Sequence, residues 1–155
     1  MGSSPTGRID MNKETGHTYE TLVEDLLVEH SPYTITRQMG MGTKPNNKTK
    51  HRVDIFIHEN REVLSLKYQR VVGTAEEKIP YEVLVLQNLV NKGRCDLATI
   101  VLAGEESAWT QKEWYLTENF CTNMGCPDVR IITHEEFVNE YTTETIVENK
   151  GLWSD

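Results

Sequence analysis

Residues 52–67 read RVDIFIHENREVLSLK and have the alternating pattern of two β-strands joined by a tight turn. The apolar residues assigned to one face of each strand are Val53, Ile55 and Ile57 in the first and Leu64 and Leu66 in the second. Side chains alternate between the two faces of a strand, so this spacing predicts a hairpin. The predicted turn is Glu59-Asn60, in which Asn60 tolerates a positive φ. In this register Asp54 lies opposite Ser65, on the face that carries Lys67, and opposed Cβ atoms are about 5 Å apart.

This hairpin therefore gathers an acid, a hydroxyl and a base on a half-buried sheet face. Charged groups in such a place are costly unless they pair or bind something. One interpretation is a structural ion pair between Asp54 and Lys67 at the end of a sheet. The other is a divalent-metal site with an adjacent lysine, an arrangement that hydrolyses phosphodiesters.

The length and composition predict one ordinary globular domain over residues 1–155, since 37% of the residues are hydrophobic and 26% are charged. No apolar run approaches the roughly 20 residues of a membrane span. Residues 1–17 lack the apolar segment of a secretory signal, so we expect a flexible lead-in there. Three cysteines, an odd number, indicate reduced thiols and a cytoplasmic, intracellular protein rather than a disulfide framework.

The formal net charge of −8 argues against a protein that coats nucleic acid non-specifically. It does not exclude a nuclease, because carboxylates that gather Mg²⁺ add to the acidic excess. The basic residues cluster locally, just before Asp54, and are Lys44, Lys48, Lys50, His51 and Arg52. Phosphate contacts are expected in this cluster if the substrate is DNA.

The rest of the chain alternates helical and strand patterns. Helices are expected over residues 18–30, 74–93, 107–121 and 134–141, and strands over residues 33–41, 96–104 and 128–133 besides the hairpin. The second helix begins with a capping-box pattern at Thr74, Gly93 stops it, and Pro80 either kinks it or marks a second start. The order α-β-β-β-α-β-α-β-α predicts an α/β (α+β) fold, a mixed sheet flanked by helices.

Two of the expected helices carry acids that could reach a site. Glu20 lies on the border of the apolar stripe of residues 18–30, whereas Glu24 points further out, toward solvent. The helix over residues 74–93 is apolar on nearly every face, including at Leu84, which predicts burial. Glu76 and Glu82 lie on this helix, and a carboxylate on a buried helix is expected to be paired or to hold a metal.

With these elements in place, residues 18–104 resemble the PD-(D/E)XK, or restriction-endonuclease-like, nucleases, whose common core has the order αβββαβ. Their motif is an acid on the second core strand and an acid-x-lysine on the third. Asp54 matches the first acid and Lys67 matches the lysine. Glu20 matches the acid that several branches, including the Holliday-junction resolvases, carry on the first helix. Residues 105–155 would be additions to this core.

The chain departs from the family pattern at two positions. Val53 stands where the family often has proline, which is a minor change. Ser65 stands where the family has its second acid, and serine is a poor metal ligand. One branch of restriction enzymes has serine-x-lysine and takes its acid from the following helix. Here Glu76 and Glu82 follow Lys67 on the predicted helix, and the sequence leaves both as candidates.

The resemblance implies a Mg²⁺-dependent mechanism, with Mn²⁺ as a substitute. Asp54 would be the central metal ligand, Glu82 the second, Glu76 its competitor, and Glu20 an outer or second-metal ligand. Lys67 would orient the attacking water or stabilise the transition state, Gln69 would position water or contact the phosphate, and Ser65 would complete the motif. The expected DNA-binding residues are Arg37, Lys44, Lys48, Lys50 and Arg52.

The function implied in this way is a site-specific DNA endonuclease of restriction or homing type, in a bacterial or phage-like context. One compact domain holds one site for two strands of double-stranded DNA. We therefore expect a homodimer, a tetramer, or a heteromer with a recognition or second-strand subunit. The alternatives are a Holliday-junction resolvase and a catalytically inactive DNA-binding or assembly subunit that keeps the fold.

Overall fold

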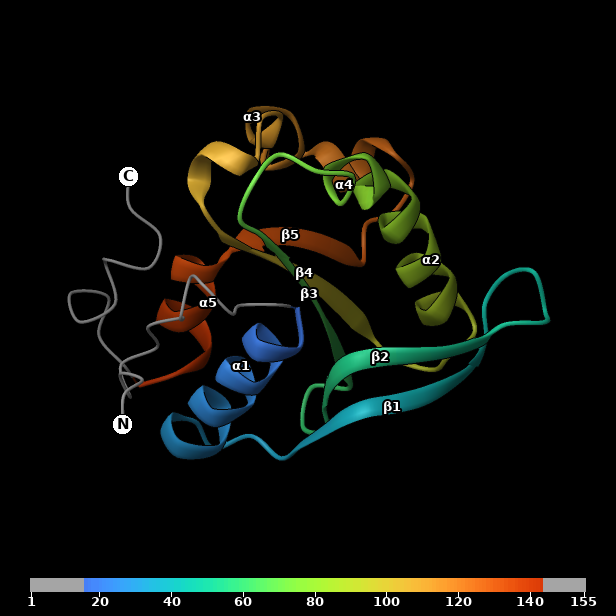
Figure 1. Ribbon diagram of the computed structural model, residues 1–155. Coiled ribbons are helices and arrows are strands. Elements are labelled where there is room, and N and C mark those ends of the chain that lie inside the picture. The colour runs from blue at the N-terminus through green and yellow to red at the C-terminus, as the bar shows by residue number, and fades with distance from the viewer. Residues whose placement is uncertain (1–15, 144–155) are drawn as a thin grey trace.

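The computed structural model describes residues 16–143, and Figure 1 shows its elements around one central sheet. The expected lead-in over residues 1–17 lies, except for its last two residues, outside the described residues. The longer helices are α1 (Gly16–His30), α2 (Ile79–Asn91) and α5 (His134–Tyr141). The shorter ones are η1 (Glu76–Lys78), η2 (Glu106–Ala108), α3 (Lys112–Tyr115) and α4 (Phe120–Asn123). The strands are β1 (Ile35–Thr43), β2 (Lys50–Ile57), β3 (Glu62–Gln69), β4 (Leu97–Gly104) and β5 (Val129–Thr133).

The five strands form one mixed sheet in the order β1-β2-β3-β4-β5. The first three are an antiparallel meander, and β3, β4 and β5 are parallel. Helix α2 lies in the crossover connection between the parallel strands β3 and β4, where a helix is usual. The predicted mixed sheet with flanking helices is confirmed.

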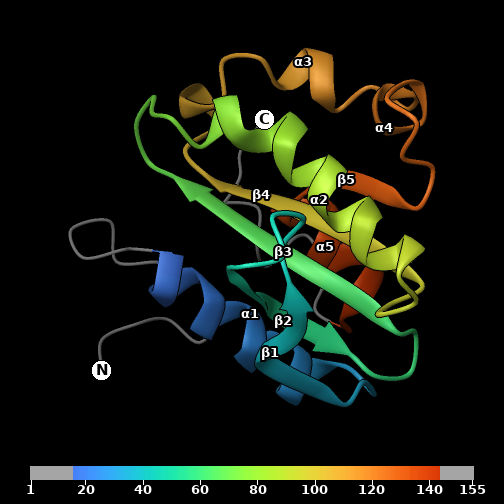
Figure 2. The ribbon, with the colours of Figure 1, turned by 90° about the vertical axis from the view of Figure 1, so that its right-hand side faces the viewer.

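Helices cover both faces of the sheet, and each face has its own apolar core. Helices α1 and α5 lie on one face, and α2, α3 and α4 lie on the other (Figures 1 and 2). Strand β4 runs between these two layers, so nearly all of its residues are buried, which explains its continuous apolar sequence. No helix among residues 16–143 is long and apolar enough to cross a membrane.

Strand β2 does not alternate as its sequence predicts. Ile55 and Ile57 pack in the core beneath α1, whereas Val53 packs in the core beneath α2. The expectation that these three residues share one face is therefore wrong. Gln38 of β1, at the position across from Asp54, has a φ of 51°, a left-handed value that bends the strand where the alternation changes.

Two predictions about local geometry are also wrong. The positive φ of the hairpin connection falls at Arg61, with a value of 50°, and not at Asn60. No capping box forms at Thr74. Instead the 3₁₀ turn η1 leads into α2 at Ile79, and Pro80 lies in the first turn, where the missing N–H of proline has no cost. The second start at Pro80 is thus the correct alternative.

Two predictions about helix burial and length fail because tertiary packing decides them. Leu84 on α2 is 49% exposed, so this helix is not buried all round. The helix expected over residues 107–121 is broken into η2, α3 and α4. Its aromatic residues Trp109, Tyr115 and Phe120 pack in the α2-side core.

Candidate active site

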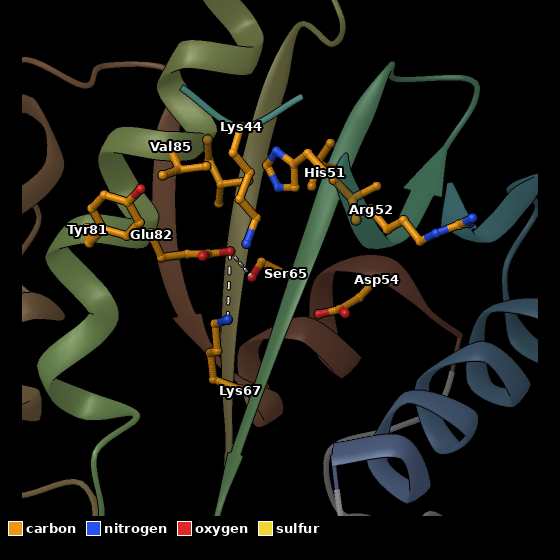
Figure 3. Close-up of a pocket in the computed structure, with 12 residues that line it drawn as sticks. Lys44, His51, Arg52, Asp54, Ser65, Lys67, Tyr81, Glu82 and Val85 are labelled. Atoms are coloured by element: carbon orange, nitrogen blue, oxygen red, sulfur yellow. Dashed lines mark hydrogen bonds and ion pairs between the residues drawn. The ribbon is translucent and has the colours of Figure 1, made fainter. Parts of the chain in front are cut away.

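A pocket of about 180 Å³ opens between strands β2 and β3 and helix α2. Its polar lining includes Asp54 from β2, Ser65 and Lys67 from β3, and Glu82 from α2 (Figure 3). The last observed pair of β2 and β3, Ile55 with Leu64, has the register that the sequence predicts, and one step further along this register Asp54 would lie across from Ser65. Four side chains that sequence analysis assigns to catalysis thus line one pocket.

Asp54 lies where β2 and β3 separate beyond their last backbone pairs. The Leu66 N–H donates a hydrogen bond to Asp54 Oδ2 at 2.7 Å, which orients the carboxylate. Burial raises the pKa of Asp54 above its ordinary value, although the Leu66 N–H and Lys67 oppose the shift. Glu20 and Glu82 add to the increase by charge repulsion. Ionisation of the Asp54 carboxyl is therefore unfavourable, and a bound cation would favour the ionised form.

Glu82 stands at the centre of the polar cluster. Its Oε2 atom accepts a hydrogen bond from Ser65 Oγ at 2.6 Å and lies 3.7 Å from Lys67 Nζ (Figure 3). The first turn of α2 carries Glu82, and the buried residues Ile79 and Val83 fix that turn against the sheet. The helix therefore delivers a carboxylate to the strand position where the family motif has its second acid.

Glu76 has a different environment from Glu82. Its carboxylate accepts hydrogen bonds from the Thr110 hydroxyl at 2.9 Å, the Gln111 N–H at 2.6 Å and the Tyr115 hydroxyl. It does not line the pocket. Of the two acids that the sequence leaves open, the structure brings Glu82 and not Glu76 to Lys67.

Gln69 also turns away from the pocket that it was expected to serve. Its side chain is 7% exposed, and its Nε2 donates to the Ala108 carbonyl at 2.7 Å. The backbone at Gln69 runs beside β4, where a Cβ on Gly104 would come within 2.1 Å of the Gln69 carbonyl oxygen. Gln69 thus joins the end of β3 to the segment after β4.

Glu20 lies behind Asp54 and not in the pocket. It accepts hydrogen bonds from Arg37 Nε at 3.2 Å and Gln38 Nε2 at 2.9 Å. Arg37 also donates to Glu24 Oε1 at 2.8 Å, so the expected solvent exposure of Glu24 is only partial. Charge repulsion from Glu20 helps to raise the pKa of Asp54. Arg37 is bound to α1 through Glu20 and Glu24.

The expected DNA-binding residues do not all lie at the pocket. Lys44 and Arg52 line it, whereas Arg37 is bound to Glu20 and Glu24. Lys48, on the β1–β2 connection, and Lys50, at the start of β2, are exposed. Arg52 donates from Nη1 to the Gln38 carbonyl at 3.1 Å. His51 also lines the pocket, and sequence reasoning placed it only in the basic cluster. The change of phase in β2, which turns this part of the strand toward α2, carries no signal in the sequence.

The donors in the pocket fit a hydrated divalent cation. Residues 16–143 contain no group of three or more His, Cys, Asp and Glu side chains placed to enclose a metal ion. Mg²⁺, however, keeps several waters and needs only one or two carboxylates together with substrate phosphate. Asp54 and Glu82 could supply two hard oxygen ligands, and burial of Asp54, with charge repulsion from Glu20 and Glu82, raises the pKa of its carboxyl.

The fold and this pocket define the class of protein. The αβββαβ core, with an acid on β2, a lysine on β3 and a carboxylate beside it, is that of restriction-endonuclease-like nucleases. The family model of a PD-(D/E)XK nuclease superfamily domain matches residues 11–143. The chain belongs to the PD-(D/E)XK nuclease superfamily, whose members generally use divalent metals. No curated protein and no solved structure matched the chain.

Proposed function

We propose that this protein is a Mg²⁺-dependent, site-specific DNA endonuclease of restriction or homing type. The observation that carries the proposal is the meeting of Asp54, Lys67 and Glu82 in one pocket of a PD-(D/E)XK fold. The ion pair between Lys67 and Glu82 also has a structural interpretation. That interpretation does not explain Asp54, which is half-buried and has a raised pKa beside two further carboxylates.

In this mechanism Asp54 and Glu82 would hold the cation, and Mn²⁺ could substitute for Mg²⁺. When bound, the metal would lower the pKa of a water and offset charge on the phosphate. Lys67 donates to the attacking water or to a phosphate oxygen, where it stabilises negative charge that grows in the transition state. Ser65 holds the Glu82 carboxylate in place, and the Leu66 N–H holds that of Asp54.

The remaining acids and the arginine of β1 have supporting roles in this proposal. The charge of Glu20 repels that of Asp54, so a cation bound at Asp54 would be favoured more strongly. Arg37 and Gln38 keep Glu20 in position by their hydrogen bonds. We leave Glu76 outside the metal site, because three hydrogen bonds from residues 110–115 hold it elsewhere.

Basic residues around the pocket would bind the DNA strand. Lys44 and Arg52 line the pocket, and the exposed residues Lys48, on the β1–β2 connection, and Lys50, at the start of β2, add positive charge nearby. Local charge of this kind attracts phosphates even when the net charge is −8. One such site cuts one strand, so we propose a homodimer, a tetramer, or a heteromer with a recognition subunit for double-strand cleavage.

The three free cysteines, all buried, suit a reducing cytoplasmic setting.

Cleavage of supercoiled plasmid by the full chain, with Mg²⁺ and with EDTA, tests the function. We expect discrete Mg²⁺-dependent cuts that are lost in Asp54→Ala and Lys67→Ala. The matched controls are Glu77→Ala and Lys78→Ala, which change an exposed acid and an exposed lysine of the turn η1, outside the pocket, and which should cut normally.

A four-way junction is included as a second substrate, alone and with plasmid competitor. Cleavage of the junction alone would overturn the restriction or homing assignment in favour of a resolvase. Binding without any cleavage of either substrate, in Mg²⁺ and in Mn²⁺, would overturn the enzymatic assignment in favour of the inactive subunit.

A further inference from the structure

His51 is a buried polar side chain of the pocket for which the mechanism above has no use. It is 6% exposed, and its Nδ1 atom has no hydrogen-bond partner among the described residues. A buried nitrogen without a hydrogen-bond partner destabilises the folded state. Such groups in native proteins indicate a bound water or ion, or a functional role.

Three other buried side-chain atoms of residues 16–143 also lack partners, on Gln69, Asn88 and His134. None of these residues lines the pocket. His134 has its other ring nitrogen, Nδ1, bonded to the Tyr19 hydroxyl at 2.7 Å inside the α1-side core. His51 differs because its imidazole borders a space that a ligand can enter.

The surroundings of His51 favour an anion as that ligand. Lys44 lies beside His51, on the side of Glu82 and Ser65 opposite Lys67, whereas the Arg52 side chain points away and donates to the Gln38 carbonyl (Figure 3). The nearest anion is unsuited to be the partner, because Glu82 Oε2 already accepts from Ser65 and lies beside Lys67. An incoming phosphate oxygen would meet a lysine and a ring N–H there, and both are hydrogen-bond donors.

A neutral His51 imidazole can donate a hydrogen bond without repelling the lysines near it. Burial lowers the pKa of His51 below its ordinary value, and Lys44, Lys67 and Lys92 lower it further, although Glu82 raises it. A neutral imidazole donates one N–H and remains compatible with the ammonium group of Lys44 beside it.

We propose that His51 and Lys44 form a phosphate subsite of the pocket, which holds the phosphate next to the scissile one on the nucleic-acid strand. This inference rests on the proposed function, because it takes a nucleic acid as the substrate. It adds to that function a binding residue whose task is to fix the strand along the pocket. The metal ligands and Lys67 then act on the neighbouring phosphate.

Binding of a DNA duplex to the full chain, in Ca²⁺ so that cleavage does not interfere, is the first test. We expect His51→Gln and Lys44→Ala each to weaken binding about tenfold, the loss of one hydrogen bond to a charged group. His51→Gln keeps a side-chain N–H donor but places it at a different distance from the backbone. His51→Asn, with a shorter side chain, serves as the second variant. The control is His58→Gln, because His58 is exposed and bonded to Thr36 outside the pocket.

Steady-state cleavage separates a binding role from a merely structural one. The subsite predicts that His51→Gln raises KM about tenfold with a small change in kcat and in melting temperature. A structural role predicts a lower melting temperature with an unchanged KM for the folded fraction, and that result would overturn the proposal.

Nitrogen resonances of the histidine rings provide a direct readout that does not depend on catalysis. Addition of the DNA duplex should shift the ring signals of His51 in a saturable way and leave those of His134 unchanged. Inorganic phosphate alone should shift the same His51 signals more weakly, and Lys44→Ala should reduce both effects. If DNA binds with no change at His51, the subsite is wrong and the proposed function survives. If no duplex binds at all, both fail.

Discussion

Ser65 and Glu82, 17 residues apart in the chain, meet in a hydrogen bond of 2.6 Å from Ser65 Oγ to Glu82 Oε2. Ser65 occupies the strand position where the superfamily motif has its second acid. The carboxylate of Glu82 therefore reaches the place that the strand would otherwise supply, and it does so from the neighbouring helix. Under the proposed function, this contact would account both for the departure of the motif at Ser65 and for the position of Glu82 on α2.

The first prediction separates the two glutamates that the sequence leaves as candidates. Glu82→Gln should lower cleavage at least about 100-fold, since it removes the charge of a metal ligand, and should leave the fold intact. Glu76→Gln should keep cleavage close to wild type below its melting temperature. Plasmid cleavage measured beside thermal melting checks both, and equal loss of activity in the two folded variants would contradict the assignment.

A second prediction concerns stability and pH at Glu76. Burial alone would raise the pKa of this carboxyl, but hydrogen bonds from Tyr115, Gln111 and Thr110 outweigh it and lower the pKa below 4.5. A lowered carboxyl pKa stabilises the fold above the unfolded pKa, and this contribution is lost as the pH falls through the folded value.

Glu76→Gln should therefore lower the free energy of unfolding by about 1–3 kcal/mol at pH 7.5. Urea denaturation at pH 7.5 and near pH 4 measures the difference. The gap between wild type and variant should narrow at the acid pH, and a gap that widens there would refute the role of the charge.

Sequence patterns predict the elements of this fold that depend on local periodicity. Helix α1, strands β1 to β5 and helix α5 lie within a few residues of their expected ranges, because local apolar patterns and β-strand propensity mark them. The observed pairing of Ile55 with Leu64 also has the register predicted for the hairpin. The candidate pocket could thus be anticipated from the hairpin and the order of elements.

The parts that could not be predicted depend on long-range contacts. The bend at Gln38 and the change of phase in β2 bring His51 into the pocket, and no local pattern in the sequence marks them. The choice between Glu76 and Glu82 depends on hydrogen bonds across 34 residues or more, to Thr110 and Tyr115. Such contacts override local propensity, as they do in the broken helix of residues 107–121.

The third prediction follows from the raised pKa of Asp54. Burial favours the protonated carboxyl in the folded state, so ionised Asp54 reduces stability above its folded pKa, and this penalty disappears as the pH falls. Asp54→Asn keeps an acceptor for the Leu66 N–H and removes the charge. Without divalent cations it should melt at a higher temperature than wild type at pH 8, with a smaller difference near pH 4.

Added Mg²⁺ should reverse the order of the two proteins in that experiment. A cation that binds the folded state stabilises it by roughly 1.4 kcal/mol for each tenfold excess over Kd, and Asp54→Asn should lose this gain together with cleavage. Differential scanning calorimetry of both proteins, with and without Mg²⁺, measures the changes in melting temperature. Equal stabilisation of wild type and variant by Mg²⁺ would remove Asp54 from the metal site.

The fourth prediction tests a part of the core that is remote from the pocket. The Tyr19 hydroxyl is bonded to His134 Nδ1 at 2.7 Å, and burial lowers the pKa of His134 to about 3, so the ring is neutral. Tyr19→Phe leaves the ring with neither nitrogen bonded, which should cost about 1–3 kcal/mol of unfolding free energy. Urea denaturation measures this loss, and cleavage below the melting temperature should be unchanged. Loss of cleavage in the folded variant would couple this core to the site.

The last prediction returns to the meeting of Ser65 and Glu82. Because their side-chain oxygens are 2.6 Å apart, an acid placed at 65 should deliver its carboxylate close to the point that Glu82 now serves. Ser65→Asp alone adds a second negative charge beside Glu82 and should lower activity or stability, since like charges at such a distance repel.

In the double variant Ser65→Asp with Glu82→Gln, the repulsion is absent and the strand supplies the acid. It should cleave at least about tenfold faster than Glu82→Gln. This would restore part of the roughly 100-fold rate that Glu82→Gln loses. The control is Ser65→Asn with Glu82→Gln, which has the same shape without the charge and should remain inactive. Kinetics of single-turnover cleavage measure the recovery. If the double variant is no more active than its control, Glu82 does more than supply a carboxylate at that point, and the relocation of the acid from strand to helix is not the reason for Ser65.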